Sequence, residues 1–239
     1  MKPILIFLSI LFLSSAANAQ QQPQFNDDDL VYAVVKDTDG YVNVRQGPSV
    51  NAQIVGKIYN YSVFSCGVNK SNWWKVLLVQ TDGQNKSYQL EGYIHKSRIL
   101  LLTNWGAPDG KNSLSVIVKE RPFESKKHQL LYSKENPNEN GGSELVKIDG
   151  NFFWGTDGEI PKEVISYVSV SIKGTQISIP KNAFDDLYEP HLKNVSVCHG
   201  PDNTIYISMS NSDGAGAYTI IWVIKDNKYY RRYIDDSMV

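Results

Sequence analysis

Apolar and polar positions alternate in short runs along most of the chain, and this pattern predicts strands. In the first half the runs are rich in Val, Ile, Tyr and Trp and are separated by Gly, Asn, Asp and Ser clusters. These runs cover residues 31–35, 41–45, 54–59, 63–66, 73–79 and 92–95. A spacing of about 8 to 12 residues per strand is typical of a small barrel or sandwich, because βαβ units need connections of helix length.

A stretch rich in Asn, Gly, Pro and Asp at residues 103–112 interrupts this pattern, and we place a domain boundary there. Strands are predicted again behind it, at residues 114–118, 129–133, 145–149, 165–172, 176–179, 195–198, 205–209, 218–224 and 229–234. The expected fold is therefore mainly all-β. A barrel at residues 30–102 is followed by a β-rich domain at residues 113–239.

Only residues 180–187 break the strand pattern of the second half. Pro180 suits the first position of a helix, and Ala183, Phe184 and Leu187 fall three and four residues apart on one face. We expect one short helix in this segment.

The N-terminal residues have the pattern of a secretory signal peptide. Lys2 supplies a positive charge, residues 4–13 form a short apolar run, and residues 17–19 (Ala-Asn-Ala) make a cleavage site. The apolar run is far shorter than the roughly 20 residues that cross a bilayer, so we expect no membrane span. The expected signal peptide is residues 1–19, a polar spacer follows at 20–29, and the mature protein is exported to the periplasm or secreted.

The charge and the cysteine count narrow the possible partners. The 24 Lys and Arg residues nearly balance the 25 Asp and Glu residues, so the chain lacks the basic field of nucleic-acid-binding proteins.

Cys66 and Cys198 lie between apolar neighbours, which favours two buried thiols, although export also permits a disulfide between the two halves. Residues 37–40 (Asp-Thr-Asp-Gly) lack the further ligands of a calcium loop and predict a turn. No metal or cofactor is predicted.

Four spaced blocks of the first half resemble the bacterial SH3 (SH3b) domain. That family has a strand ending in Asn-Val-Arg, a Gly-Pro-Ser turn, an aliphatic-aliphatic-Gly strand, a tryptophan strand and a Gly-aromatic-aliphatic closing strand. The matching blocks are YVNVRQGPS at 41–49, IVGKI at 54–58, WWKV at 73–76 and GYIH at 92–95. The resemblance covers about 70 of the 220 residues that follow the predicted cleavage site and implies an SH3-like barrel.

SH3b domains are generally binding modules without catalytic activity, and they often recognise peptidoglycan peptides. The resemblance therefore implies binding of a wall peptide or of an envelope protein. Flat aromatic rings give contact area at low entropic cost, and alternation is expected to place one of Trp73 and Trp74 in the core and the other outside. The candidate ligand-binding residues are Tyr59, Tyr61, Trp74 and Tyr93, with the loop 81–89 beside them.

The loop 210–218 suggests an alternative function. Its small residues would let it approach a partner closely, and it loosely resembles the Ser-Gly-x-x-Tyr loops with which some periplasmic lysozyme inhibitors enter an active site. The candidate partner residues are Ser212, Asp213, Gly214 and Tyr218. The protein would then be an inhibitor or immunity protein against a peptidoglycan hydrolase, whereas a long loop without such a role is the simpler interpretation.

One dense cluster of residues with catalytic potential leaves a cell-wall hydrolase as a lesser alternative. It comprises Asp185, Asp186, Glu189, His191, Cys198 and His199. Cys198 and His199 are adjacent in a predicted strand and point to opposite faces, which is the wrong geometry for a dyad. We therefore expect an exported, non-enzymatic binding protein of the bacterial cell envelope.

Overall fold

The computed structural model describes residues 30–81, 87–108, 113–137 and 142–236. Over these residues the chain forms sixteen strands joined by loops and short 3₁₀ turns. The mainly all-β fold expected from the sequence is confirmed. The predicted signal peptide and polar spacer lie outside the described residues. Within the described ranges, no helix has the length and apolar character needed to cross a membrane.

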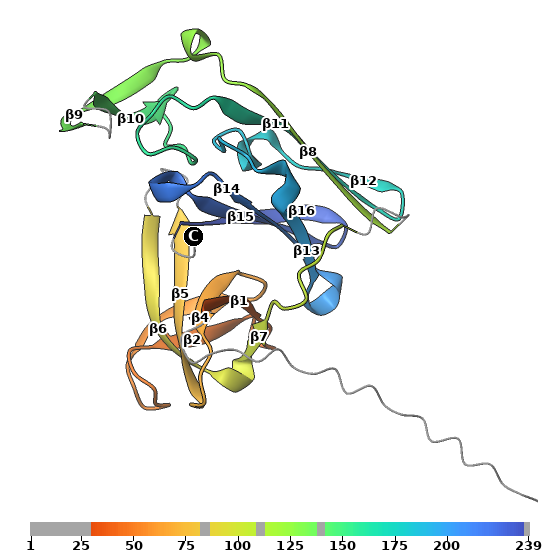
Figure 1. Cartoon of the computed structure of the whole chain (residues 1–239). Helices are drawn as coiled ribbons and strands as arrows, with labels where there is room; N and C mark the ends of the chain where they lie inside the picture. The colour runs from red at the N-terminus through yellow and green to blue at the C-terminus, as the bar shows by residue number, and fades with distance from the viewer. Residues whose placement is uncertain (1–29, 82–86, 109–112, 138–141, 237–239) are drawn as a thin grey trace, which may run out of the picture.

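The first seven strands form one sheet that curls into a half-barrel (Figure 1), in the order β3-β2-β6-β5-β4-β1-β7. The strands are β1 (Leu30–Val35), β2 (Tyr41–Arg45), β3 (Ile54–Tyr59), β4 (Phe64–Gly67), β5 (Trp73–Thr81), β6 (Ser87–His95) and β7 (Ile99–Leu101). Val42 and Val44 of β2 are buried, while the alternate residues Asn43 and Arg45 are partly exposed, as a strand with one face on a core requires. At Gly92, β6 approaches β2 so closely that a Cβ atom would lie 2.4 Å from the Arg45 carbonyl oxygen.

The remaining strands form a hairpin and two further sheets. The hairpin pairs β9 (Leu130–Pro137) with β10 (Ser143–Ile148). A three-stranded sheet has the order β12-β11-β8 and consists of β8 (Leu114–Pro122), β11 (Glu163–Ile172) and β12 (Thr175–Ser178). A four-stranded meander consists of β13 (Val195–His199), β14 (Ile205–Asn211), β15 (Tyr218–Lys225) and β16 (Lys228–Asp235).

The meander is the middle layer of the molecule (Figure 1), with the barrel on one face and the three-stranded sheet on the other. In β15, Ile221 and Val223 belong to the barrel core. The alternate residues Ile220, Trp222 and Ile224 belong to the core shared with the three-stranded sheet. Both faces of β15 are therefore buried, and the barrel core continues into a sheet from the second half of the chain.

The segment at residues 180–187 contains a single 3₁₀ turn, Lys181–Ala183, in place of the longer helix suggested by its spacing. Pro180 is the N-cap and not the first helical residue. The following residues are drawn into sheet-like contacts, because Leu187 forms a bridge with Trp154 and its neighbour forms one with Val164. Tertiary pairing thus replaces the helical hydrogen bonds that the spacing alone would favour.

One predicted turn is confirmed, and a second turn joins the last two strands. Asp226 and Asn227 both have positive φ and connect β15 with β16 as a two-residue hairpin turn. Residues 37–40 form a turn closed by a hydrogen bond from the Gly40 N–H to the Asp37 carbonyl at 3.1 Å. Cys66 and Cys198 are separate buried thiols, and burial raises the pKa of the Cys198 thiol to about 11.

Candidate functional site

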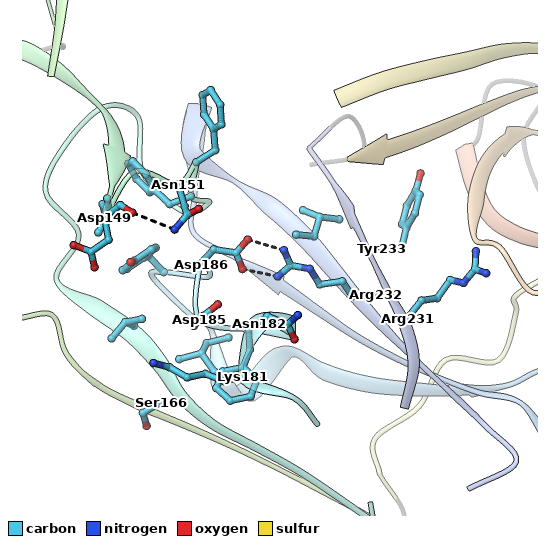
Figure 2. A pocket seen from close by; sticks show the side chains of 18 of the residues that line it. Asp149, Asn151, Ser166, Lys181, Asn182, Asp185, Asp186, Arg231, Arg232 and Tyr233 are labelled. Carbon is cyan, nitrogen blue, oxygen red and sulfur yellow. Dashed lines mark hydrogen bonds and ion pairs between the residues drawn. The ribbon is translucent and has the colours of Figure 1, made fainter. Parts of the chain in front are cut away.

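A cleft with a volume of about 780 Å³ lies along the outer edge of β16. The barrel lines one side of it through Ser62, Val63, Leu78 and Val79. The other side comes from β8, β11 and the loops around residues 148–153 and 181–188. Figure 2 shows Arg232 directed toward the second side and Arg231 and Tyr233 directed toward the barrel.

The floor of the cleft is the edge of a sheet. Four consecutive residues of β16, Arg231 to Ile234, line the cleft. Because successive side chains of a strand point to opposite faces, only the strand edge can present four consecutive residues to one cavity. In the part of the chain that the structure describes, β16 pairs with β15 alone, so this edge carries open backbone groups.

The centre of the cleft holds two adjacent carboxylates in different environments. Both oxygens of Asp186 accept hydrogen bonds from the Arg232 guanidinium, with Oδ2 2.6 Å from Nη2. The two side chains are only 18% and 24% exposed, respectively. Partial burial, and then the charge of Asp186, raise the pKa of the neighbouring Asp185 carboxyl. Asp186 is therefore paired with its arginine, while Asp185 forms no ion pair among the described residues, although the charges of Lys181 and Arg232 lower its pKa in part.

An aromatic wall and a histidine–aspartate pair close the side away from the barrel. Nδ1 of His128 lies 2.6 Å from Oδ2 of Asp149, and this hydrogen bond, followed by one from the Gln129 N–H, lowers the pKa of Asp149. The His128 ring stacks on Phe123 with a centroid distance of 4.7 Å. Phe123 in turn meets the ring of Tyr188 edge to face at 5.3 Å. This wall offers apolar area beside charged groups.

Arg231 is the cation of the barrel side. Its Nη1 donates to the Ser62 hydroxyl and its Nη2 to the Tyr230 hydroxyl, both at 2.9 Å. Among the described residues, no carboxylate forms an ion pair with Arg231. Two neutral hydroxyls leave its charge uncompensated, so Arg231 can bind an anionic group of a ligand.

The chemistry of the cleft is that of recognition by charge and backbone. The Ser166 hydroxyl donates to the Lys119 carbonyl at 3.1 Å. Over the described ranges, no group of three or more His, Cys, Asp or Glu side chains could hold a metal ion. Cations, carboxylates, aromatic rings and a strand edge together can bind a peptide.

The aromatic residues predicted to bind ligand on the barrel lie apart. Tyr59 is exposed on the edge strand β3 and contacts Tyr41 at a centroid distance of 6.1 Å. The Tyr61 hydroxyl donates to Asp202 at 2.5 Å, which ties this ring to the turn between β13 and β14. Tyr93 is half-buried on β6. Within the described ranges, no ring contact joins any two of the four candidates.

Trp74 requires a correction. Alternation does separate the two tryptophans, but Trp74 is the one that packs against the barrel core, and its indole N–H donates to the Asn69 carbonyl at 3.0 Å. Trp73 points away and meets His95 edge to face at 5.4 Å. Trp74 is thus held within the fold, and both tryptophans are half-buried.

The loop 210–218 also requires a correction. Tyr218 is fully buried because it begins the middle-layer strand β15, and its hydroxyl donates to the Tyr188 carbonyl at 2.9 Å. The Ser212 hydroxyl donates to the Gly155 carbonyl at 2.8 Å. Tyr218 therefore cannot reach a partner. Asp213 and Gly214 remain exposed at the tip.

The six residues of potential catalytic type do not converge. Asp185 and Asp186 lie in the cleft, whereas the Glu189 carboxylate accepts hydrogen bonds from the backbone N–H groups of Lys162 and Glu163. His191 and His199 are exposed outside the cleft. The Cys198 thiol donates to the Thr103 carbonyl at 3.0 Å.

The sequence did not single out Arg231, Arg232, His128 or Asp149. One signal was present: two successive arginines in the apolar terminal strand at residues 229–234 are typical of a charged sheet edge. The pairing of His128 with Asp149 had no such signal, because it joins the two ends of the hairpin β9–β10.

No family model matches the chain, and neither a curated protein nor a solved structure matches it. The resemblance to the SH3b family stays a prediction from the quoted sequence blocks.

Proposed function

We propose that this protein is an exported, non-enzymatic binding protein of the bacterial cell envelope, and that it binds a peptide in the cleft along β16. The cleft itself is the observation that supports this function. It combines a cation and a carboxylate that form no ion pair among the described residues with an aromatic wall around a strand edge. A peptide offers both signs of charge and backbone amides, so it can use all of these groups.

Two parts of this proposal come from the sequence. Export rests on the signal-peptide pattern of residues 1–19, and the envelope location rests on the SH3b-like blocks of the first half. Both a stem peptide of the wall and a segment of an envelope protein satisfy the chemistry of the cleft.

Co-sedimentation with insoluble peptidoglycan and titration with synthetic peptides, both on the mature protein, test the proposal. Arg231→Ala removes the cation of the barrel side and should weaken binding by about tenfold or more, the effect of one charge-assisted hydrogen bond. Lys75→Ala is the matched control, because Lys75 lies on the exposed barrel surface, paired with Glu91 and away from the cleft. Binding no greater than that of an unrelated protein in both assays would refute the proposal.

One observation favours the hydrolase alternative over the inhibitor alternative. Two adjacent carboxylates in unlike environments, Asp185 with a raised pKa and Asp186 paired with Arg232, are a pattern found in acid–base catalysis. Release of soluble fragments from peptidoglycan by the mature protein, lost in Asp185→Asn, would support this alternative. The inhibitor alternative has only the exposed tip at residues 213–215 left to contact an enzyme.

A further inference from the structure

We infer that the cleft binds an extended segment of a polypeptide, which adds to the free edge of β16 as a fifth strand of the meander. This inference rests on the proposed function of the cleft and specifies the ligand as a segment of a protein partner. A wall peptide has similar charged groups and amides, and the experiment below distinguishes a wall peptide from a protein segment.

The strand β16 lies at the edge of its sheet. It is the last strand in the order β13-β14-β15-β16, and the described chain gives it no second neighbour. Edge strands are usually short, covered or blocked by Pro or a bulge. The stretch from Arg231 to Ile234 contains no Pro or bulge and lines the cleft, and its protection as an edge is the charge of Arg231 and Arg232. The pairing of β16 with β15 has a register shift just before this stretch, because Ile224 pairs with Tyr229 and Val223 pairs with Arg231.

The cleft has the size needed for an added strand. A strand of four residues extends over about 13 Å, and an added strand lies about 4.8 Å from its neighbour. The cleft volume of about 780 Å³ lies within the range of ligand sites, about 300–1,000 Å³. The barrel lies on one face of β16, and the three-stranded sheet of β8, β11 and β12, the outer sheet, lies on the other. Side chains of an added strand would therefore enter both sides of the cleft.

The two sides of the cleft carry charges of opposite sign. Arg231 points toward the barrel, donates hydrogen bonds to two hydroxyl groups and packs over the Tyr230 ring. Asp185 lies on the opposite side beside the Asp186–Arg232 pair (Figure 2). Neighbouring residues of an added strand point to opposite faces. A segment with an acidic residue directly beside a basic one would place the acid at Arg231 and the base at Asp185.

The probe is a library of acetylated, amidated octapeptides of L-residues with Glu-Lys or Lys-Glu at the centre and random flanks. Binding to the mature protein is measured, and the strongest binder is then N-methylated at one position at a time. We expect affinity to fall by about tenfold at every second residue only, because alternate N–H groups of a strand face its neighbour. Arg231→Ala should weaken the Glu-containing peptide and leave its Gln analogue unchanged, while Lys75→Ala should change neither.

The outcomes separate this inference from the proposed function. A binder that shows no two-residue periodicity on N-methylation overturns strand addition and leaves peptide binding intact. Binding to purified peptidoglycan with no binder in the library also overturns the inference, since the wall peptide is then the ligand. Failure of both probes overturns the inference together with the proposed function. Amide hydrogen exchange gives an independent readout: added protection at residues 231–234 is expected, and its absence with a bound peptide argues against strand addition.

Discussion

At the scale of single residues, the ionised form of Asp185 is disfavoured by its surroundings in the folded protein. Partial burial and the charge of Asp186 raise its pKa. The protonated Asp185 is therefore favoured in the folded protein. The stability that this gives is fully present below the unfolded pKa of about 4 and is lost as the pH rises through the folded pKa. Asp185→Asn should therefore increase the free energy of unfolding at pH 7, by at most about 1 kcal/mol since solvent screens the group. Natural proteins retain such costs mainly at functional positions.

Urea unfolding at pH 7 and at pH 3.5 measures this effect. The gain from Asp185→Asn should become smaller at the lower pH, because the raised pKa leaves more of the wild-type carboxyl protonated there. Asp213→Asn, at an exposed loop position, is the control and should change stability by less than about 0.5 kcal/mol at either pH. An equal gain from Asp185→Asn at both pH values would show that charge is not its cause.

The Asp186–Arg232 pair should contribute measurably to stability, unlike the ion pairs of the surface. Both side chains are mostly buried and the hydrogen bonding is bidentate, so removing either partner leaves the other charge poorly solvated. We expect Asp186→Ala and Arg232→Ala each to destabilise the fold by about 2–3 kcal/mol, with a coupling of about 1–2 kcal/mol in a double-mutant cycle. The exposed Lys75–Glu91 pair, at 61% and 55% exposure, should give a coupling below about 0.5 kcal/mol.

At the scale of elements, β15 differs from an ordinary strand of an antiparallel sheet. Such strands usually have one solvated face, so one of two successive residues tolerates truncation. Here Ile220 and Ile221 are both fully buried, on opposite faces and in different cores. Ile220→Ala and Ile221→Ala should each cost about 2–5 kcal/mol of unfolding free energy.

Chemical denaturation of the two variants tests this placement. Ile117→Ala on β8 is the matched control because its side chain is 48% exposed, and it should cost less than about 1 kcal/mol. A small effect at either Ile220 or Ile221 would mean that one face of the meander is not packed.

The sequence predicted the strands well and their packing less well. The alternation at residues 41–45 identifies a strand with one face in a core, and the structure has that strand. The apolar run at residues 218–224 was predicted as a strand, but its burial on both faces, and with it the burial of Tyr218, was not predicted. The spacing at residues 180–187 suggested a helix, because periodicity cannot register the bridges that Leu187 and its neighbour form with other segments.

The cleft could not be predicted from local pattern. Asp185, Arg231 and His128 belong to three separate segments, and only the stacking of the barrel, the meander and the outer sheet brings these segments around one cavity. A strand pattern identifies which face is apolar but does not identify the strand that ends at a sheet edge. That order depends on non-local pairing.

At the scale of the whole molecule, the barrel and the second half are joined by more than the linker at residues 103–112. Tyr206, Ile221 and Tyr233 complete the barrel core from the meander. At the surface, Asp202 accepts hydrogen bonds from Lys36 and from the Tyr61 hydroxyl, so the turn after β13 is tied to the barrel. These contacts couple the folding of the two halves.

We therefore expect the mature protein to unfold in one cooperative transition. Trp74 packs on the barrel core and Trp222 lies in the other core, so single-tryptophan variants carrying one or the other would report the two regions separately. Their fluorescence midpoints in urea should coincide, because loss of the meander exposes apolar area on both sides at once. A fragment of residues 30–102 lacks the meander residues that cover its core and should be less stable than the barrel in the whole chain, or should aggregate. Two separated midpoints, together with a fragment as stable as the whole chain, would show that the barrel folds independently and that the shared core contributes little.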